Sequence, residues 1–489
     1  MKTTATGGGG NVEAIYPLST MQQGLLFQTL YSETWEYFQQ VSYTLRGRLD
    51  PEALRRAWER VVERHPVLRT LFMWERGDKP LQVVRRKVAL PWVTFDWRGL
   101  PEPEQQARLE AFLAADRELG FDLSKAPLMR TALVRLGDEK YQFTWSYHHI
   151  LMDGWSGTAV RNEVFAFYHA FCQGQDFEPP RPRPYKDYIA WLQQQDLRAA
   201  EEFWREQLRG FHAPTPVRLG PAPHPEAERR TDYDQWGTQL PPEATAAMQS
   251  FVRRHRLTSN TLLKGMWALL LSRYSGERDV VFGSVVSGRP AELEGVETMV
   301  GVFINTLPVR VRVEPDEPLL PWLMRMQARQ AEMSQFEYTP LSDIRGWSEV
   351  PRPLPLFDSI LVFQNFPHEA GGQGGGGGGG AAQPPGLEVS EPRVVIRNNY
   401  PFTLRSGPDP GVLNVLYDCR RYETASVARV MRHVETLLGR MVSRPEATLA
   451  ELLAEVEEAD RRHLLDKERE FKEAGAQKLK GLRRRGAGR

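Results

Sequence analysis

A proline-rich segment in the middle of the chain most limits how it can fold. The segment reads "FEPPRPRPYKDYIAW" and covers residues 177–191. Proline fixes its own φ and donates no backbone hydrogen bond, so a cluster of prolines interrupts helices and central strands. A chain of 489 residues is also too long for one ordinary core. The sequence therefore predicts at least two domains, with a boundary near this segment.

Helix and strand patterns occur on both sides of the boundary. Residues 50–66 begin with a capping aspartate and end at a proline, which predicts a helix, and residues 67–74 predict a strand. In the second half, residues 258–276 predict a capped, largely buried helix that ends at glycine. Residues 279–290 predict a strand that runs into a turn. This mixture predicts two layered α/β domains.

Composition and charge exclude several classes of protein. Lys+Arg 63 against Asp+Glu 62 gives a net charge of +1, so no overall field favours nucleic acid or a membrane surface. The start, "MKTTATGGGG", lacks an apolar signal core, and the run "MWALLL" is too short to span a bilayer. Cys172 and Cys419 form no CxxC pair. We expect a cytoplasmic protein that binds neither nucleic acid nor a membrane.

The stretch "YQFTWSYHHILMDGWSG", residues 141–157, carries the strongest chemical pattern. If it is a strand, alternation places His149 on a face with aromatic residues and His148 on the opposite face. Adjacent histidines that point apart rarely bind one metal, and no HExxH or cysteine pair supports them. We therefore expect no metal.

His149 is a candidate for acid–base chemistry. A partly desolvated imidazole stays neutral near pH 7, where it can accept a proton or hydrogen-bond a reacting amine. The alternative is that both histidines are structural residues at a strand end. Asp153 could orient His149 or form a buried ion pair with an arginine, for which Arg69 is a candidate. Gly154 would allow a tight reversal of the backbone.

These residues resemble a known family. "HHILMDG" (residues 148–154) matches the HHxxxDG motif of nonribosomal peptide synthetase condensation domains. Further segments resemble that family in its order along residues 12–460. They are "YPLSTMQQGLLFQ" (16–28), "RHPVLRTLF" (64–72), "YKDYIAW" (185–191), "MVGVFINTLPVRV" (299–311), "LFDSILVFQNFP" (356–367) and "NNYPFTL" (398–404).

The resemblance implies an α/β fold of two chloramphenicol-acetyltransferase-like subdomains arranged in a V with a central tunnel. It implies that an acceptor amine attacks a donor thioester and forms an amide. Both substrates would arrive on phosphopantetheine arms of donor and acceptor peptidyl carrier proteins, beside an adenylation domain of the same synthetase. The domain itself, expected to be a monomer, would bind no cofactor.

The resemblance also implies roles for individual residues. The catalytic motif would comprise His148, His149, Asp153 and Gly154, with His149 as general base or as the group that positions the amine. His148 would be structural, Asp153 would form a salt bridge with Arg69, and Gly154 would shape the loop. Trp155, Ser156 and Asn305 would line the substrate tunnel; the alternatives are core packing for Trp155 and a helix cap for Ser156. Asn305 and Thr306 would belong to a segment that bridges the subdomains.

Subtype and boundaries complete the expectations. The motifs look most like domains that accept an L-configured donor. The alternatives are an epimerization domain, a non-catalytic recruitment platform of the same fold, and a free acyltransferase. We expect a flexible leader at 1–11, subdomains at 12–180 and 181–460, and a basic linker tail at 461–489. The polyglycine run at 370–386 would be a surface loop.

Overall fold

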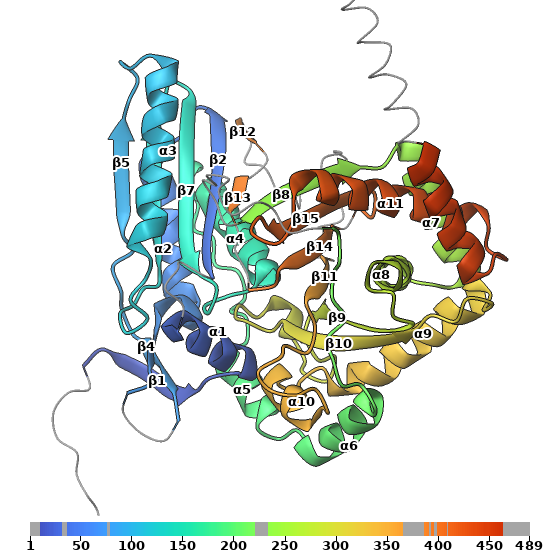
Figure 1. The fold of residues 1–489 in the computed structure, drawn as a ribbon. Helices are drawn as coiled ribbons and strands as arrows, with labels where there is room; N and C mark the ends of the chain where they lie inside the picture. The colour runs from blue at the N-terminus through green and yellow to red at the C-terminus, as the bar shows by residue number, and fades with distance from the viewer. Residues whose placement is uncertain are drawn as a thin grey trace, which may run out of the picture.

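The computed structural model describes residues 10–31, 37–75, 79–220, 233–364, 386–390, 393–395, 399–407 and 409–462. Figure 1 shows two α/β lobes side by side, the first coloured mainly blue to cyan and the second mainly green to red. Most of the expected leader and polyglycine loop, and the tail beyond residue 462, lie outside the described residues. None of the described helices is long and apolar enough to cross a membrane.

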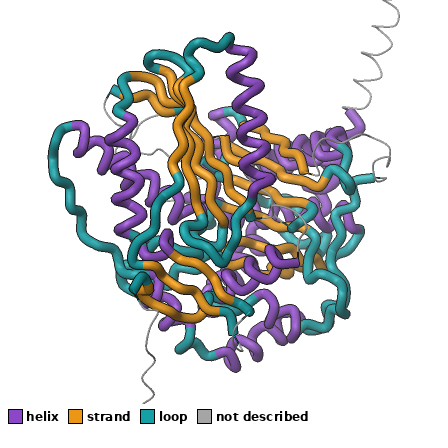
Figure 2. Tube along the Cα trace, turned by 90° about the vertical axis from the view of Figure 1, so that its left-hand side faces the viewer, coloured by secondary structure: helices purple, strands orange, loops and turns teal. Residues whose placement is uncertain are grey.

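The first lobe is built on a mixed sheet. Its strands are β2 (Phe38–Gly47), β5 (Trp92–Asp96), β6 (Met129–Arg135), β7 (Lys140–His148), β12 (Leu387–Val389) and β13 (Arg393–Val395). The order is β12-β2-β7-β6-β5, with β13 also paired to β2. Figure 2 shows this sheet at the front, with the second lobe behind it. The strand β7, which ends at His148, therefore lies inside the sheet.

Helices cover both faces of this sheet: α2 (Pro51–Arg64), α3 (Glu102–Leu119) and α4 (Gly154–Cys172). Trp58 of α2 packs against Phe143 and Trp145, with ring centroids 5.6 and 4.8 Å apart. On the opposite face, Gln40 of β2 donates a hydrogen bond to the carbonyl of Leu113 in α3 at 3.2 Å. The two-residue period of a strand explains this division between an aromatic and a polar face.

The helix predicted in residues 50–66 is confirmed, and the strand predicted at 67–74 is confirmed for residues 70–73 but not for 67–69. The carboxylate of Asp50 accepts hydrogen bonds from the first backbone amides of α2, as the capping pattern predicts. The chain then forms a 3-10 turn, η1 (Pro66–Arg69), before the short strand β3 (Thr70–Met73). The fixed φ of Pro66 suits the start of such a turn, which the apolar run alone did not reveal.

A small sheet lies beside α1 (Thr20–Tyr31) in the first lobe. It contains β1 (Val12–Pro17), β3 and β4 (Leu81–Arg85) in the order β1-β4-β3.

The second lobe contains another mixed sheet. Its strands are β8 (Tyr233–Gln239), β9 (Asp279–Val286), β10 (Asn305–Arg312), β11 (Ser359–Phe363), β14 (Phe402–Ser406) and β15 (Val412–Asp418). Their order is β10-β9-β11-β14-β15-β8. The predicted strand in residues 279–290 is confirmed as β9.

Helices of the second lobe surround its sheet. The longer ones are α7 (Pro242–His255), α8 (Ser259–Ser275), α9 (Leu319–Met333) and α11 (Thr424–Ser443); the shorter ones are α6 (Leu197–Leu208) and α10 (Leu341–Trp347), with the 3-10 turn η3 (Ser334–Phe336). The helix α5 (Tyr185–Leu192) and the 3-10 turn η2 (Val296–Thr298) bury their apolar residues in the core of the first lobe instead. Residues 449–462 are also helical. The rings of Trp267 in α8 and Phe402 in β14 stack with their centroids 5.2 Å apart, and Gly276 ends α8 with a φ of 78°. The predicted buried helix is confirmed.

Several segments of the second half join the first lobe. The strands β12 and β13 pair with β2. Met299 and Phe303 are fully buried in the hydrophobic core that also contains Trp58 and Phe143. Tyr185 donates a hydrogen bond to the carbonyl of Val302 at 2.5 Å. The lobes are therefore interlocked, and the exact limits expected at 12–180 and 181–460 stay a prediction.

Candidate active site

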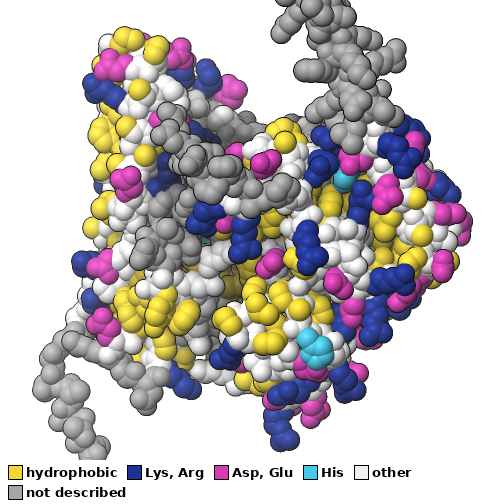
Figure 3. Space-filling view, in the orientation of Figure 1, with side chains coloured by type: hydrophobic (Ala, Val, Ile, Leu, Met, Phe, Trp, Pro, Cys, Tyr) yellow, Lys and Arg dark blue, Asp and Glu magenta, His cyan; other side chains and the backbone are white. Residues whose placement is uncertain are grey.

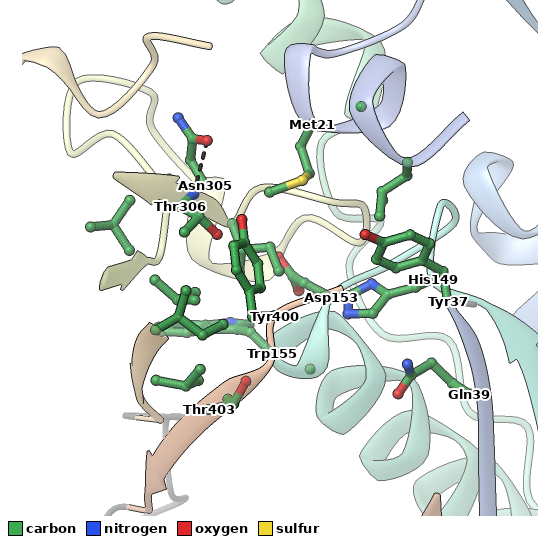
Figure 4. Close-up of a pocket in the computed structure, with 18 of the residues that line it drawn as sticks. Met21, Tyr37, Gln39, His149, Asp153, Trp155, Asn305, Thr306, Tyr400 and Thr403 are labelled. Carbon is green, nitrogen blue, oxygen red and sulfur yellow. Dashed lines mark hydrogen bonds between the residues drawn. The ribbon is translucent and has the colours of Figure 1, made fainter. Parts of the chain in front are cut away.

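A cavity of about 1640 Å³ lies between the two lobes. The first lobe contributes residues of α1, β2, the end of β7 and the start of α4; the second contributes residues of β9, β10, β11, β14 and β15. Figure 4 shows side chains from both lobes projecting into it. Figure 3 shows exposed hydrophobic side chains over α1, where Phe27, Leu30 and Tyr31 are exposed near the cavity.

The aromatic face of the β2–β7 pair forms one wall of the cavity. In register, Gln39 lies opposite Tyr147 and Val41 opposite Trp145. Beyond the end of β7, the backbone amide of His149 donates to the carbonyl of Tyr37 at 2.8 Å. Six residues of this face line the cavity: Tyr37, Gln39, Val41, Trp145, Tyr147 and His149. The alternation predicted from the sequence is confirmed, and His148 lies on the other side of the strand.

His148 is fully engaged by neighbouring groups. Its Nδ1 accepts a hydrogen bond from the backbone amide of Ile150 at 3.1 Å. Its Nε2 lies 3.2 Å from the hydroxyl of Thr29, which itself donates to the carbonyl of Leu25 at 2.7 Å. The one arrangement that satisfies all three contacts is a neutral ring with its proton on Nε2. Burial, with a smaller effect of His149, lowers the pKa of His148 to about 3. This ring has no free lone pair for chemistry.

His149 is half-buried and points into the cavity (Figure 4). Its Nδ1 is buried and has no hydrogen-bond partner within the described part of the chain. Burial lowers the pKa of His149, while the charge of Asp153 and nearby backbone groups oppose that shift. The ring is therefore neutral near pH 7 and can accept a proton or hold the hydrogen of an amine.

Asp153 is held by groups other than the expected one. Its Oδ1 accepts from the backbone amide of Ser156 at 2.8 Å, which caps α4, and its Oδ2 accepts from the amide of Phe303 at 3.0 Å. Its ion-pair partner is Arg289, at 3.5 Å, with both side chains buried. The predicted salt bridge with Arg69 is wrong, because Arg69 pairs with Glu13 at 2.7 Å.

Arg289 joins the histidine loop to the second half of the chain. It donates to the hydroxyl of Ser156 at 2.9 Å and to the carbonyl of Met299 at 3.0 Å. Its guanidinium stacks over the ring of Phe303, 4.0 Å from the centroid, and lies 5.0 Å from that of Trp155. Asp153 therefore fixes the loop that carries His149, and it relays no proton to the imidazole in this arrangement.

The residues after Asp153 have different environments. Gly154, the first residue of α4, is exposed on the cavity wall, and its φ is not among the positive ones. Trp155 lines the cavity and donates from Nε1 to the carbonyl of Glu297 at 3.0 Å. Ser156 was expected to line the tunnel, which is wrong. It is fully buried, and its hydroxyl bonds both the amide and the carbonyl of Gly301.

Asn305 and Thr306 begin β10 and reach the cavity from the second lobe. The amide of Asn305 donates to the carbonyls of Glu337 and Thr339 at 2.8 and 2.6 Å. Its Oδ1 accepts from the backbone amide of Thr306 at 2.9 Å. These bonds use the polar atoms of Asn305 and support a structural role. Figure 4 shows Tyr400 between this strand and the first lobe.

Sequence reasoning missed several residues of this site. Arg289 lies in "SGRP", a segment without a recognisable chemical pattern. Tyr37 and Gln39 carry no motif, but alternation along β2 would have found them once its pairing with β7 was known. Among the described residues, no group of three or more His, Cys, Asp or Glu is placed to hold a metal ion.

Comparisons with known proteins agree with this geometry. A family profile described as "Condensation domain" matches residues 12–465. Linear gramicidin synthase subunits C and D of Brevibacillus parabrevis are 42% and 43% identical over 93% and 94% of this chain. The chain spans only 6% and 9% of the length of these two relatives.

Solved structures show the same fold. The starter condensation domain of rhizomide synthetase superposes with a TM-score of 0.73 at 19% identity, covering 89% of this chain and 96% of that one. The X-domain from teicoplanin biosynthesis gives a TM-score of 0.71 at 23% identity, with the same two coverages. The two-lobed fold expected from the resemblance is confirmed. Because the match extends over both lobes and their shared cavity, the chain belongs to the condensation-domain family.

Proposed function

We propose that this chain forms an amide bond between a thioester-bound acyl or peptidyl donor and the amine of a thioester-bound aminoacyl acceptor in nonribosomal peptide synthesis. The reaction is an acyl transfer, as in its family. The amine nitrogen bonds to the thioester carbon, the carbon–sulfur bond breaks, and the thiolate that leaves takes up the proton that the nitrogen loses. The observation that carries the proposal is the position of neutral His149 in a cavity shared by both lobes.

The geometry suits this reaction. A cavity of about 1640 Å³ is larger than a typical small-molecule pocket and can receive two extended arms. Holding both reactants in one cavity removes much of the entropic barrier. His149, fixed through Tyr37 and through the loop that Asp153 anchors, meets the amine as base or positioning group. General base catalysis of this kind contributes roughly 10²–10⁴-fold.

Donor and acceptor peptidyl carrier proteins are the proposed partners, with an adenylation domain in the same synthetase. The similarity to gramicidin synthase subunits, of which this chain matches a small part, supports that setting. The substrates arrive on phosphopantetheine, and the domain binds no cofactor of its own. An L-configured donor, a monomeric domain and a cytoplasmic location complete the proposal.

Carrier-bound substrates test this function directly. A donor carrier loaded with a peptidyl thioester and an acceptor carrier loaded with an aminoacyl thioester are mixed with the protein, and transfer is followed by intact-protein mass spectrometry. We expect transfer by the wild type and a loss of roughly 10²–10⁴-fold in His149→Ala.

Each contrary result has a distinct meaning. Equal transfer by both proteins would remove His149 from the chemistry and leave proximity as the source of catalysis. No transfer by the wild type with several donors would favour the recruitment platform. Inversion of the donor residue without transfer would favour an epimerization domain.

A further inference from the structure

Gln39 is a buried polar residue on the cavity wall. It is 4% exposed, and its amide nitrogen Nε2 has no hydrogen-bond partner among the residues that the structure describes. It lines the cavity, and Figure 4 shows its amide on the same side as His149. Buried polar groups are almost always hydrogen-bonded, so an unpaired donor that faces a substrate cavity indicates a ligand group as its partner.

The register of the sheet places this amide beside the reacting centre. Tyr37 lies next to His149 across the strand pair, and Gln39 follows two residues later on the same face. Two residues along a strand correspond to roughly 7 Å, and diagonal neighbours have Cβ atoms roughly 7–8 Å apart. A glutamine side chain is long enough to direct its amide into the space in front of the imidazole.

A second unpaired donor on this wall is less well placed. The indole Nε1 of Trp145 is also buried without a partner in the described structure. However, its ring packs between Trp58 and Tyr147, with centroid distances of 4.8 and 4.5 Å. Trp145 lies four residues before His149 in the chain, whereas Gln39 lies opposite Tyr147, which is only two residues before His149. Of these two unpaired donors, Gln39 is therefore the one nearer to His149 along the strand pair.

We propose that the side-chain amide of Gln39 donates a hydrogen bond to the carbonyl oxygen of the donor thioester. This inference rests on the proposed function. When the acceptor nitrogen bonds to the carbonyl carbon, an electron pair moves onto that oxygen. When the tetrahedral species collapses, the pair returns, the carbon–sulfur bond breaks, and sulfur leaves as a thiolate that takes up the proton lost by nitrogen. A donor aimed at the oxygen stabilises the charged species more than the substrate.

The first test compares Gln39→Met with the wild type in the carrier-bound transfer assay. Methionine keeps a similar length and volume but lacks the amide, so transfer should slow by on the order of 10²-fold. The urea midpoint should stay unchanged or rise, because the variant removes a buried amide without a protein partner. A residue with only a structural role would lose stability together with activity, and that result would overturn the proposal.

Gln28→Met is the matched control. Gln28 also lines the cavity, but its Oε1 already accepts a hydrogen bond from the hydroxyl of Tyr37, and the residue is exposed. Its transfer rate should stay within about threefold of the wild type, since its amide is not the buried unpaired one. An equal loss in both variants would show a general sensitivity of the cavity wall and would also overturn the assignment to Gln39.

A binding test separates the reacting carbonyl from the amide carbonyls of the phosphopantetheine arm. Two donor carriers are prepared with stable analogues, one a ketone in which CH₂ replaces the thioester sulfur, the other with that carbonyl reduced to CH₂. Both keep the amides of the arm. The wild type should bind the ketone at least about tenfold more tightly, and Gln39→Met should lose this preference.

The outcomes distinguish the two proposals. Normal transfer by both the wild type and Gln39→Met would reject the assignment to Gln39 and leave the proposed function intact. No transfer by the wild type would reject the proposed function, while the ketone preference would still decide whether Gln39 binds a carbonyl. A preference for the ketone that persists in Gln39→Met, or no preference in the wild type, would show that the Gln39 amide does not bind the reacting carbonyl. Either result would reject the inference.

Discussion

The two faces of the β2–β7 strand pair carry the same kinds of residue in opposite states. On the face toward α3, protein groups form hydrogen bonds with both polar atoms of the Gln40 amide and with both ring nitrogens of His148. On the cavity face, Gln39 and His149 each keep a buried nitrogen without a partner in the described structure. Neighbouring residues of identical type are thus separated into structural and functional groups by whether their hydrogen bonds are complete.

The difference gives the two histidines separate roles. A fully bonded imidazole such as His148 stabilises the strand end, and a ring with an unpaired nitrogen such as His149 keeps its capacity for a substrate. Asp153 is a structural residue like His148, because Ser156, Phe303 and Arg289 bind its carboxylate oxygens. Its contribution to the site is to hold in place the loop that carries His149.

The largest expected loss of stability follows from breaking that buried network. Arg289→Met leaves the carboxylate of Asp153 buried without its cation, so the free energy of unfolding should fall by roughly 3–5 kcal/mol. Urea unfolding of the two proteins measures the loss.

Arg69→Met is the control for that prediction, and it tests the corrected ion pair. Arg69 pairs with Glu13, whose side chain is 37% exposed and can be rehydrated, but it also donates to buried carbonyls. We expect a loss of roughly 1–3 kcal/mol. A larger loss for Arg69→Met than for Arg289→Met would show that the network around Asp153 is not the stronger anchor of the fold.

The second prediction concerns pH and the structural histidine. The pKa of His148 falls from 6.5 in the unfolded chain to about 3 in the fold, because the ring is buried. The unfolded chain therefore binds a proton that the folded protein does not. The stabilisation by the neutral ring is complete above pH 6.5 and is lost as the pH falls from 6.5 toward 3, by about 1.4 kcal/mol per pH unit.

A substitution isolates this contribution from other groups. Between pH 7.5 and 5.0, the unfolding free energy of the wild type should fall by ~2 kcal/mol more than that of His148→Gln, which cannot titrate there. His433, whose pKa is also lowered by burial, is present in both proteins and cancels in the difference. An identical pH dependence of the two proteins would mean that His148 is protonated equally in the folded and unfolded states.

The sequence predicts what depends on local periodicity. The two-residue period of residues 141–149 assigned His149 and His148 to opposite faces, and the cap at Asp50 located α2. These features depend on residues that are close together in the chain, so they can be predicted from a single sequence.

Contacts between distant segments were not predictable in this way. The buried partner of Asp153 is Arg289 from the other half of the chain, and nothing in the residues around either one indicates the pairing. Arg289 also donates a hydrogen bond to the hydroxyl of Ser156, which is buried in the protein and does not reach the cavity. The unpaired amide of Gln39 is also invisible in sequence, because only the packing of both strands shows which of two adjacent glutamines has no partner.

The smallest expected effect tests the comparison between those two glutamines. Gln40 donates to Asp116 at 2.7 Å and to the carbonyl of Leu113 at 3.2 Å, and its Oε1 accepts from Arg117 at 2.7 Å. Gln40→Met removes these three hydrogen bonds, two of which join buried Leu113 and Asp116, so the unfolding free energy should fall by roughly 1–3 kcal/mol. The Nε2 of Gln39 has no partner among the described residues, so Gln39→Met should change the unfolding free energy by less than about 0.5 kcal/mol.

Peptide transfer should show the opposite order, because the side chain of Gln40 is bonded to α3 and is not among those that line the cavity. Transfer per folded molecule should stay near the wild-type rate in Gln40→Met and fall in Gln39→Met. Urea unfolding and the carrier-bound assay on the same preparations give both quantities. If Gln40→Met slowed transfer as much as Gln39→Met, the two faces would be coupled through the strands. Complete hydrogen bonding would then no longer separate the structural residues from the functional ones.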